Sequence, residues 1–264
     1  MRPEDIRHVG VVGAGLMGSG IVEVCARAGL RVTFTEGSPE LVAAGDLLGR
    51  IDADTDLGAL GDVDLVIEAA TEDRDAKAGI FAELGKRTRP EVVLASNTSS
   101  IPIRELGDAS SRPESVIGMH FFNPPPVMAL LELTPSDATT EETFELVRAF
   151  GTDVLGKTCV RSGDQAGFIV NRLLIPYLFD AIRLYEQGFA GREDIDAAMR
   201  LGLAHPMGPL ELSDLIGLDT LLSIGEVLRE AFPADPRYDA PTLLRDLVAD
   251  GKLGKKTGSG FYDT

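Results

Sequence analysis

The sequence has no tryptophan, only two cysteines and only three histidines among its 264 residues. Cys25 and Cys159 stand far apart and show no metal-binding or redox spacing, so a disulfide framework and a cysteine-based metal site are both disfavoured. We therefore expect no metal site and a protein of the reducing cytoplasm. With so few histidines, each one is worth considering for chemistry.

Basic residues are also scarce, because 25 lysines and arginines are outnumbered by 42 acidic residues, for a net charge of −17. This balance argues against nucleic acid or an anionic membrane surface as a partner. No apolar run approaches the roughly eighteen residues that a membrane span requires. The N-terminus, M-R-P-E-D-I-R, also lacks the apolar core of a signal peptide.

A glycine-rich loop follows the first predicted strand, residues 8–12, and precedes helical spacing of apolar residues that ends near Gly29. Its G-x-G-x-x-G pattern allows a tight turn, a close approach of backbone to a pyrophosphate, and packing of helix on strand. The free N–H groups of the helix N-terminus would bind the phosphates. The candidate cofactor-binding residues here are Gly13, Gly15, Leu16, Met17 and Gly18.

The remaining pattern alternates strands and helices and then turns wholly helical. Strands are predicted at 31–35, 62–69, 91–95 and 152–155, and helices at 38–50, 71–87 and 140–150. Helices alone follow at 167–188, 193–201, 208–230 with a break near Gly217, and 241–250. This order predicts an α/β protein: a Rossmann-type, doubly wound, mainly parallel sheet in residues 1–163, followed by an all-helical domain in residues 164–264.

The stretch from Gly118 to Thr134 combines His120 with an acid, Glu132. Three prolines at 124–126 lie between two apolar runs and force a rigid, non-helical reversal, because proline fixes φ and lacks a backbone donor. A strand, a stiff turn and a returning strand would bring the two side chains together as a general base and its orienting acid. The alternative is a structural histidine at a strand end and an acid that faces water.

Two further polar features lie at positions suited to ligand binding. The segment S-N-T-S-S, residues 96–100, follows a predicted strand, and open α/β sheets bind ligands beyond the carboxyl ends of their strands. It is also consistent with a simple helix cap. Asn171 is a polar residue within the apolar run 168–179, so it is either hydrogen-bonded structurally or directed into a site.

Taken together, these motifs resemble the short-chain L-3-hydroxyacyl-CoA dehydrogenases, including bacterial 3-hydroxybutyryl-CoA dehydrogenases. The resemblance runs nearly end to end. It is carried by G-A-G-L-M-G-S-G-I, D-L-V-I-E-A, A-S-N-T-S-S, G-M-H-F-F-N-P-P-P-V-M, G-F-I-V-N-R-L-L-I-P-Y, P-M-G-P-L-E-L-S-D-L-I-G-L-D and G-K-K-T-G-S-G-F-Y.

The resemblance implies a role for particular residues. His120 would remove the proton of the 3-hydroxyl group, Glu132 would orient the imidazole and stabilise its cation, and Ser99 and Asn171 would hydrogen-bond the substrate's oxygens. The positions that match family residues near the NAD cofactor are Glu72, Lys77, Ser99, Asn123 and Lys256. The family also implies an acyl thioester substrate, with CoA as carrier, and a homodimer formed through the helical domain.

One departure from the family pattern bears on the substrate. A long helical hairpin usually follows the second strand and holds part of the CoA nucleotide, but here only residues 37–63 separate Glu36 from Asp64. Arg50 is the only basic residue between positions 37 and 58, which is unfavourable for binding the CoA phosphate.

The sequence thus favours NAD-dependent interconversion of a 3-hydroxyacyl thioester, with a short acyl chain, and the 3-ketoacyl thioester. A first alternative keeps this chemistry on a substrate bound to acyl carrier protein or on a free hydroxy acid. A second alternative, of another class, is a non-catalytic NAD-binding protein.

Glu36 ends the second predicted strand, about 20 residues after the glycines, where an acid accepts hydrogen bonds from the ribose hydroxyls of NAD and repels the 2′-phosphate of NADP. We therefore predict that the protein uses NAD in preference to NADP. Measuring kcat/KM with each cofactor tests this, and equal values would show that Glu36 does not have this role.

Overall fold

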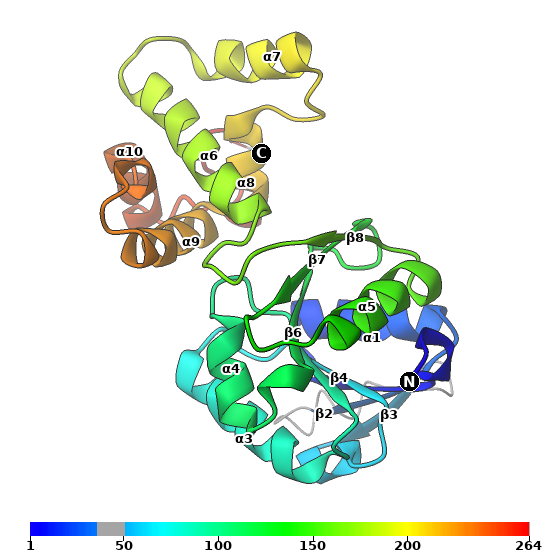
Figure 1. The fold of residues 1–264 in the computed structure, drawn as a ribbon. Helices are drawn as coiled ribbons and strands as arrows, with labels where there is room; N and C mark the ends of the chain where they lie inside the picture. Colours follow the sequence, from blue (N-terminus) through cyan, green and yellow to red (C-terminus); the bar gives the residue numbers. More distant parts are fainter. Residues whose placement is uncertain (36–50, 264) are drawn as a thin grey trace. The chain divides into compact units, whose positions relative to one another are not determined.

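The computed structural model describes residues 1–35 and 51–263. The chain divides into two compact units, Met1–Phe168 and Ile169–Thr264 (Figure 1). The predicted helix at 38–50 and the predicted ribose ligand Glu36 lie outside the described residues.

The first unit is built on one sheet whose strands run in the order β3-β2-β1-β4-β5-β6-β7-β8. The β6–β7 pair is antiparallel and every other neighbouring pair is parallel, so the predicted Rossmann-type fold is confirmed. The strands are β1 His8–Val12, β2 Arg31–Thr35, β3 Ile51–Asp54, β4 Leu65–Glu68, β5 Val93–Ser96, β6 Val116–Phe121, β7 Leu130–Pro135 and β8 Thr158–Arg161.

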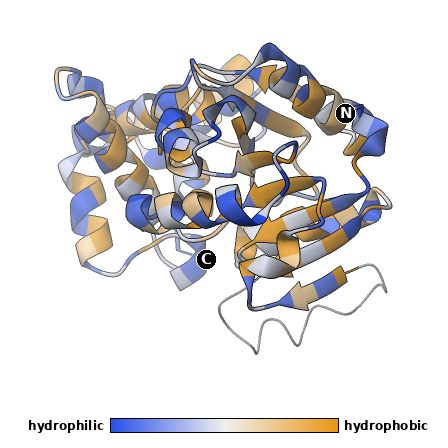
Figure 2. Cartoon of the chain, turned by 60° about the horizontal axis from the view of Figure 1, so that its bottom comes forward, coloured by the Kyte–Doolittle hydropathy of each residue, from blue (hydrophilic) through white to orange (hydrophobic). Residues whose placement is uncertain are grey.

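Helices cover both faces of this sheet. One apolar layer includes side chains of α1 (Leu16–Arg27) and α5 (Glu141–Ala149), and the other includes α3 (Arg74–Arg87) and α4 (Ile103–Ser110). Successive strand residues point to opposite faces, so Leu65 and Ile67 join the first layer and Val66 the second. A sheet buried on both sides needs continuously apolar strands, and Figure 2 shows them as mainly hydrophobic.

Two predicted details of this unit are wrong. The segment 152–155 was predicted as a strand, but residues 152–154 belong to a π-helical turn, Phe150–Val154, that directly follows α5, and Leu155 caps this turn. The last strand is β8. In addition, β3 was not predicted, because its sequence I-D-A-D is half polar and its burial alternates, as expected of an edge strand.

The second unit is helical, as predicted, and Gly217, with φ of +98°, separates α8 from α9. Its helices are α6 Val170–Glu186, α7 Arg192–Leu203, α8 Pro209–Ile216, α9 Leu218–Ala231 and α10 Thr242–Ala249. The C-terminal segment docks within this unit, because the buried Asp214 carboxylate accepts the N–H groups of Phe261 (2.9 Å) and Tyr262 (2.8 Å). Among the helices of the described residues, none is long and apolar enough to cross a membrane.

Candidate active site

The histidine and the acid predicted to act together do meet in the structure. The antiparallel register of β6 and β7 places His120 directly opposite Glu132. The two side chains are 9% and 0% exposed, and His120 Nδ1 lies 2.8 Å from Glu132 Oε2. A carboxylate only accepts hydrogen bonds, so Nδ1 carries the proton of this bond and Nε2 is the nitrogen left with a lone pair.

Two aromatic rings border the His120 imidazole. The ring centroid of Phe122 is 4.6 Å away and that of Phe168 is 5.6 Å away. Phe168 is buried and has a positive φ of 46°, which is strained for a residue with a bulky side chain. Packing of this kind restricts rotation of the imidazole, and the pattern of the sequence did not reveal Phe168 as part of this environment.

The proline turn between β6 and β7 is held by a lysine that sequence reasoning missed. Lys157 is only 8% exposed, and its Nζ donates to the carbonyl oxygens of Pro125 (2.7 Å) and Met128 (2.8 Å). Burial lowers the pKa of Lys157. The turn also touches α1, because a Cβ added at Gly20 would lie 2.7 Å from Pro125. No sequence signal marked Lys157, since a lysine in a G-K-T turn is ordinarily solvated.

The glycine loop has the shape that its sequence predicts. Gly13 has φ of +96° and donates its N–H to the Thr35 carbonyl (2.8 Å), and a Cβ at Gly18 would lie 1.9 Å from the Gly13 oxygen. A Cβ at Gly15, by contrast, would meet no atom of the described residues within 4 Å, so among these residues the space in front of the N-terminus of α1 is open. Leu16 is largely exposed beside this space, and Met17 packs partly against the core.

The candidate residues of the first unit gather at one edge of the sheet. Residue Val12 of β1 is in register with Glu68 of β4, Glu68 with Ser96 of β5, and Ser96 with Gly118 of β6. Because these strands are parallel, the glycine loop and residues 97–100 follow the carboxyl ends of β1 and β5, and His120, the next-to-last residue of β6, lies near the same end. This is the edge at which open α/β sheets bind ligands.

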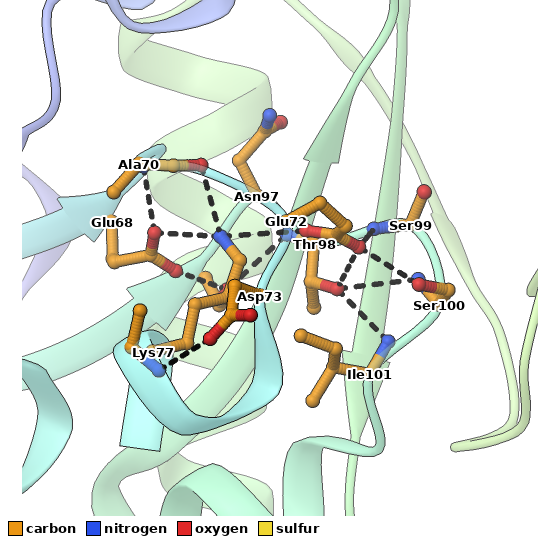
Figure 3. Close-up of polar contacts among 12 residues, drawn as sticks. Glu68, Ala70, Glu72, Asp73, Lys77, Asn97, Thr98, Ser99, Ser100 and Ile101 are labelled. Atoms are coloured by element: carbon orange, nitrogen blue, oxygen red, sulfur yellow. Dashed lines mark hydrogen bonds and ion pairs between the residues drawn. The ribbon is translucent and has the colours of Figure 1, made fainter. Parts of the chain in front are cut away.

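A polar network lies below this edge (Figure 3), in which Glu68 and Lys77 are buried and the Glu72 side chain is 41% exposed. Glu72 accepts hydrogen bonds from the hydroxyl of Thr98 and the N–H of Ser99, and Lys77, only 1% exposed, forms an ion pair with Glu68. Burial alone would raise the pKa of Glu72, but the hydrogen bond from Thr98 and the charge of Lys77 hold this pKa below its ordinary value. The sequence singled out Glu72, Lys77 and Ser99, but not Glu68.

The other predicted site residues are less enclosed. Asn123 is exposed just after β6. Asn171 and Lys256 belong to the second unit, where Asn171 is half-buried near the start of α6 and the Nζ of Lys256 lies 2.6 Å from Oδ2 of Asp219.

Comparison with known proteins finds one family along nearly the whole chain. The family model described as the NAD-binding domain of 3-hydroxyacyl-CoA dehydrogenase matches residues 8–46 and 42–165, and that of the C-terminal domain of the same family matches residues 167–264. This chain belongs to the 3-hydroxyacyl-CoA dehydrogenase family. Its cofactor is therefore NAD, in agreement with the prediction.

Similar proteins include a 3-hydroxybutyryl-CoA dehydrogenase of Mycobacterium tuberculosis, which is 49% identical over 98% of this chain and 99% of its own length. The human mitochondrial hydroxyacyl-coenzyme A dehydrogenase is 41% identical over 97% of this chain and 91% of its own length. Among solved structures, the (S)-3-hydroxybutyryl-CoA dehydrogenase PaaH1 of Ralstonia eutropha superposes with a TM-score of 0.91, at 43% identity, over 98% of this chain and 99% of that one.

The glycine loop of this family member fits the cofactor. Open space at Gly15, next to the free N–H groups at the start of α1, suits a pyrophosphate that approaches the backbone closely. Gly13 and Gly18 leave no room for a side chain, so they maintain the loop itself.

We predict that Gly15→Ala folds normally but binds NAD poorly. The φ of −65° and ψ of −170° at Gly15 suit any residue, and the new methyl group meets no atom of residues 1–35 and 51–263. It would occupy the space for the pyrophosphate, and we expect NAD affinity to fall by roughly tenfold, about 1.4 kcal/mol. Calorimetric titration with NAD and thermal unfolding measure the two effects.

Gly79→Ala on the exposed surface of α3 is the matched control, since a Cβ there also meets no atom within 4 Å in the part of the chain that the structure describes. It should raise stability by about 0.5–1 kcal/mol and leave NAD binding unchanged. If Gly15→Ala binds NAD as tightly as the wild type, the pyrophosphate does not lie against Gly15.

Proposed function

We propose that this protein is an NAD-dependent dehydrogenase that interconverts short-chain 3-hydroxyacyl-CoA and 3-ketoacyl-CoA. The observation that carries the proposal is the buried pair of His120 and Glu132, at the same sheet edge as a glycine loop suited to NAD. The family membership and the names of the similar proteins support the substrate class.

In the proposed reaction His120 is the general base. Its Nε2 accepts the proton of the substrate's 3-hydroxyl group, and the imidazolium that forms is stabilised by Glu132 on the Nδ1 side. NAD, when bound, supplies the acceptor for the hydride that leaves C3. In the reverse direction His120 returns the proton to the oxygen on C3. The aromatic rings of Phe122 and Phe168 limit the motion of the imidazole during both steps.

Other residues bind and orient the two ligands in this proposal. Ser99 and Asn171 hydrogen-bond the oxygens of the substrate. The glycine loop, with Leu16 and Met17 beside it, holds the pyrophosphate, and Glu36 binds the ribose. The family positions assigned to the remainder of the cofactor site are Glu72, Lys77, Ser99, Asn123 and Lys256. These assignments rest on the position of each residue in the family's motifs.

The carrier of the acyl group is a separate question, because the segment before β3 is short. The family model matches the first unit in two pieces that meet at residues 42–46, within the stretch where the family's hairpin is cut down. The same chemistry on an acyl carrier protein thioester or a free hydroxy acid is therefore our second candidate. A non-catalytic NAD-binding protein is a third, and it is disfavoured by the retained His120–Glu132 pair.

We further propose that the protein is a homodimer formed through its second unit and that it acts in the cytoplasm. Leu173, Phe189, Leu201 and Leu203 are all more than 60% exposed on this unit, as expected of residues buried by a partner. Cys25 and Cys159 are free thiols, which suits a reducing compartment. A single-chain mass by light scattering would contradict the dimer, and recovery in a non-cytoplasmic fraction would contradict the location.

We expect His120→Ala to lower kcat by about 10²–10⁴-fold while NAD affinity stays nearly unchanged, because the general base is lost and the glycine loop is not. Steady-state rates with NAD and 3-hydroxybutyryl-CoA, together with calorimetric titration of NAD, measure both quantities.

The matched control is His8→Gln, since His8 lies at the start of β1, at the opposite edge of the sheet, and contacts Thr33. It should retain wild-type kcat. Near-normal turnover in His120→Ala would refute the proposed mechanism. If the wild type turned over neither the thioesters nor the free hydroxy acid compared in the next paragraph, a non-catalytic NAD-binding protein would be favoured.

The carrier is tested by comparing kcat/KM for 3-hydroxybutyryl-CoA, the same acyl group on pantetheine, the same group on an acyl carrier protein, and free 3-hydroxybutyrate. If CoA is the carrier, we expect its thioester to be the best substrate, with a kcat/KM at least about tenfold higher than that of the pantetheine form. This ratio corresponds to about 1.4 kcal/mol of binding free energy from the nucleotide. Equal kcat/KM values for the CoA and pantetheine forms would show that the protein does not bind the nucleotide of CoA. They would favour the second candidate, an acyl carrier protein thioester or a free hydroxy acid as substrate.

A further inference from the structure

The turn between β6 and β7 has little of its own to hold it in place. Its prolines at 124–126 have no N–H groups to donate, and the N–H groups of Val127 and Met128 both donate to the same acceptor, the Pro124 carbonyl oxygen (3.0 Å each). Val127 and Met128 are 75% and 40% exposed, so their side chains add little packing. The position of the turn therefore depends on contacts from neighbouring elements.

Lys157 provides two of these contacts. It is 8% exposed, and its Nζ donates to the carbonyl oxygens of Pro125 (2.7 Å) and Met128 (2.8 Å). In the part of the chain that the structure describes, no carboxylate is paired with this ammonium group. Removing a charge from water is unfavourable unless other groups replace the lost hydration, and here carbonyl oxygens of the turn do so in place of an acid.

The backbone on both sides of the Lys157 side chain is fixed as well. The Lys157 N–H donates to the Gly151 carbonyl oxygen (2.8 Å) in the π-helical turn, and the N–H of Thr158, the first residue of β8, donates to the Ala129 carbonyl oxygen (2.8 Å). Because β8 is parallel to β7, and β7 is antiparallel to β6, Lys157 lies at the sheet edge where β6 ends and the turn begins. The ammonium group thus reaches the turn from a well-anchored segment.

Helix α1 bounds the same turn at another point. A Cβ added at Gly20 would lie 2.7 Å from Cδ of Pro125, which is buried, so the proline ring packs directly on the helix. This helix begins at Leu16, beside the space suited to a pyrophosphate. At the start of the turn, the ring centroid of Phe122 is 4.6 Å from that of the His120 imidazole. The turn therefore connects the helix of the cofactor loop to a ring that packs on the histidine.

We infer that Lys157 is a positioning residue, which holds the turn at 124–128 and thereby keeps Phe122 against the imidazole of His120. Through this packing it sets the direction in which Nε2 points. Lys157 touches neither substrate nor cofactor in this role. The inference rests on the proposed function in one respect, namely that His120 is the general base.

The alternative is that Lys157 serves only to stabilise the fold. Removing its ammonium group leaves two carbonyl oxygens without these donors, so thermal stability should fall under either role. The two roles differ in their local effects. Only a positioning role predicts that the turn itself loosens and that the rate falls further than an equal loss of stability elsewhere would cause.

Arg112→Met is the matched control. Arg112 precedes β6 and lies at the opposite edge of the sheet, where its guanidinium group donates to the Arg89 carbonyl oxygen (2.6 Å) and the Thr88 hydroxyl (2.7 Å). Like Lys157→Met, this substitution removes a partly buried cation from a backbone carbonyl. It should lower stability and leave both the turn and kcat unchanged.

The experiment compares Lys157→Met, Arg112→Met and the wild type. Backbone hydrogen exchange at Val127 and Met128 is measured by NMR in cofactor-free protein. Steady-state rates give kcat and KM with 3-hydroxybutyryl-CoA, calorimetric titration gives NAD affinity, and thermal unfolding gives the stability of each variant.

In Lys157→Met we expect the N–H groups of Val127 and Met128 to exchange at least about tenfold faster, since the turn that carries their acceptor is no longer held. We expect kcat to fall about 10–100-fold, as for a general base displaced by a fraction of an ångström. KM and NAD affinity should stay within about threefold, because the glycine loop and the contacts of the substrate's carrier are unchanged.

A second variant, Gly20→Ala, disturbs the turn from the side of α1 and leaves Lys157 in place. Its methyl group would meet the rigid ring of Pro125, which must then move, whereas alanine is well suited to the helix itself. We expect faster exchange at Val127 and Met128 and a fall in kcat of about tenfold. If Lys157→Met does not fold, this variant decides whether the position of the turn sets the rate, and wild-type kcat in it would overturn the inference.

Two further results would overturn the inference. Wild-type exchange in Lys157→Met, with a change in kcat no larger than in Arg112→Met, would mean that the lysine is only structural. Weakened NAD binding with wild-type kcat at saturating NAD would mean that the turn supports the cofactor and not His120. If the wild type itself does not turn over the substrate, the proposed function fails, but the exchange measurement still decides whether Lys157 holds the turn.

Discussion

The antiparallel pairing of β6 with β7 is the constraint on which the proposed chemistry depends. All other neighbouring strands in the sheet are parallel, and parallel strands cannot be joined by a short turn. The reversal at residues 124–126 allows His120 and Glu132 to face each other across one rung of the ladder. A slip of one residue would send one of the two side chains to the opposite face of the sheet. The register is supported from outside the strands by Lys157, which holds the turn through two carbonyl oxygens.

Several buried polar side chains lie together at the carboxyl ends of the parallel strands, although hydrophobic cores usually contain few such groups. Glu68, Lys77 and Ser96 are all buried, and each is satisfied by a neighbour in the same network. Such an arrangement adds little net stability but leaves few alternative conformations, because any shift would strand a charge without a partner. An active site that must place a hydroxyl group within a fraction of an ångström benefits from that rigidity.

Elements that depend on local patterns in the sequence were predicted better than elements that depend on contacts between distant residues. The glycine loop, the first two strands and the helices of the second unit were predicted correctly, because each depends on local periodicity and on residues such as Gly13 and Gly217 that adopt positive φ. The strand expected at 152–155 was wrong, since a segment as short as T-D-V-L directly after a helix is compatible with a further helical turn. The half-polar β3 was missed because an apolar–polar alternation of only four residues is too short to distinguish a strand from a loop, and its place is set by pairing with β2.

The sequence by itself determined the family, through a run of motifs that belongs to the 3-hydroxyacyl-CoA dehydrogenases, and it predicted the chemistry, from a cofactor loop after the first strand and a histidine and an acid separated by prolines. Those features are recognisable because they are local and ordered along the chain. Only the tertiary structure decided which groups support them. Three buried residues contact groups that are distant in the sequence. Glu68 contacts Ser96, Lys157 contacts the proline turn, and Phe168 packs near His120. The physical reason is that burial and hydrogen-bond partners are properties of the folded chain, whereas composition and spacing reveal only patterns that are local along the sequence.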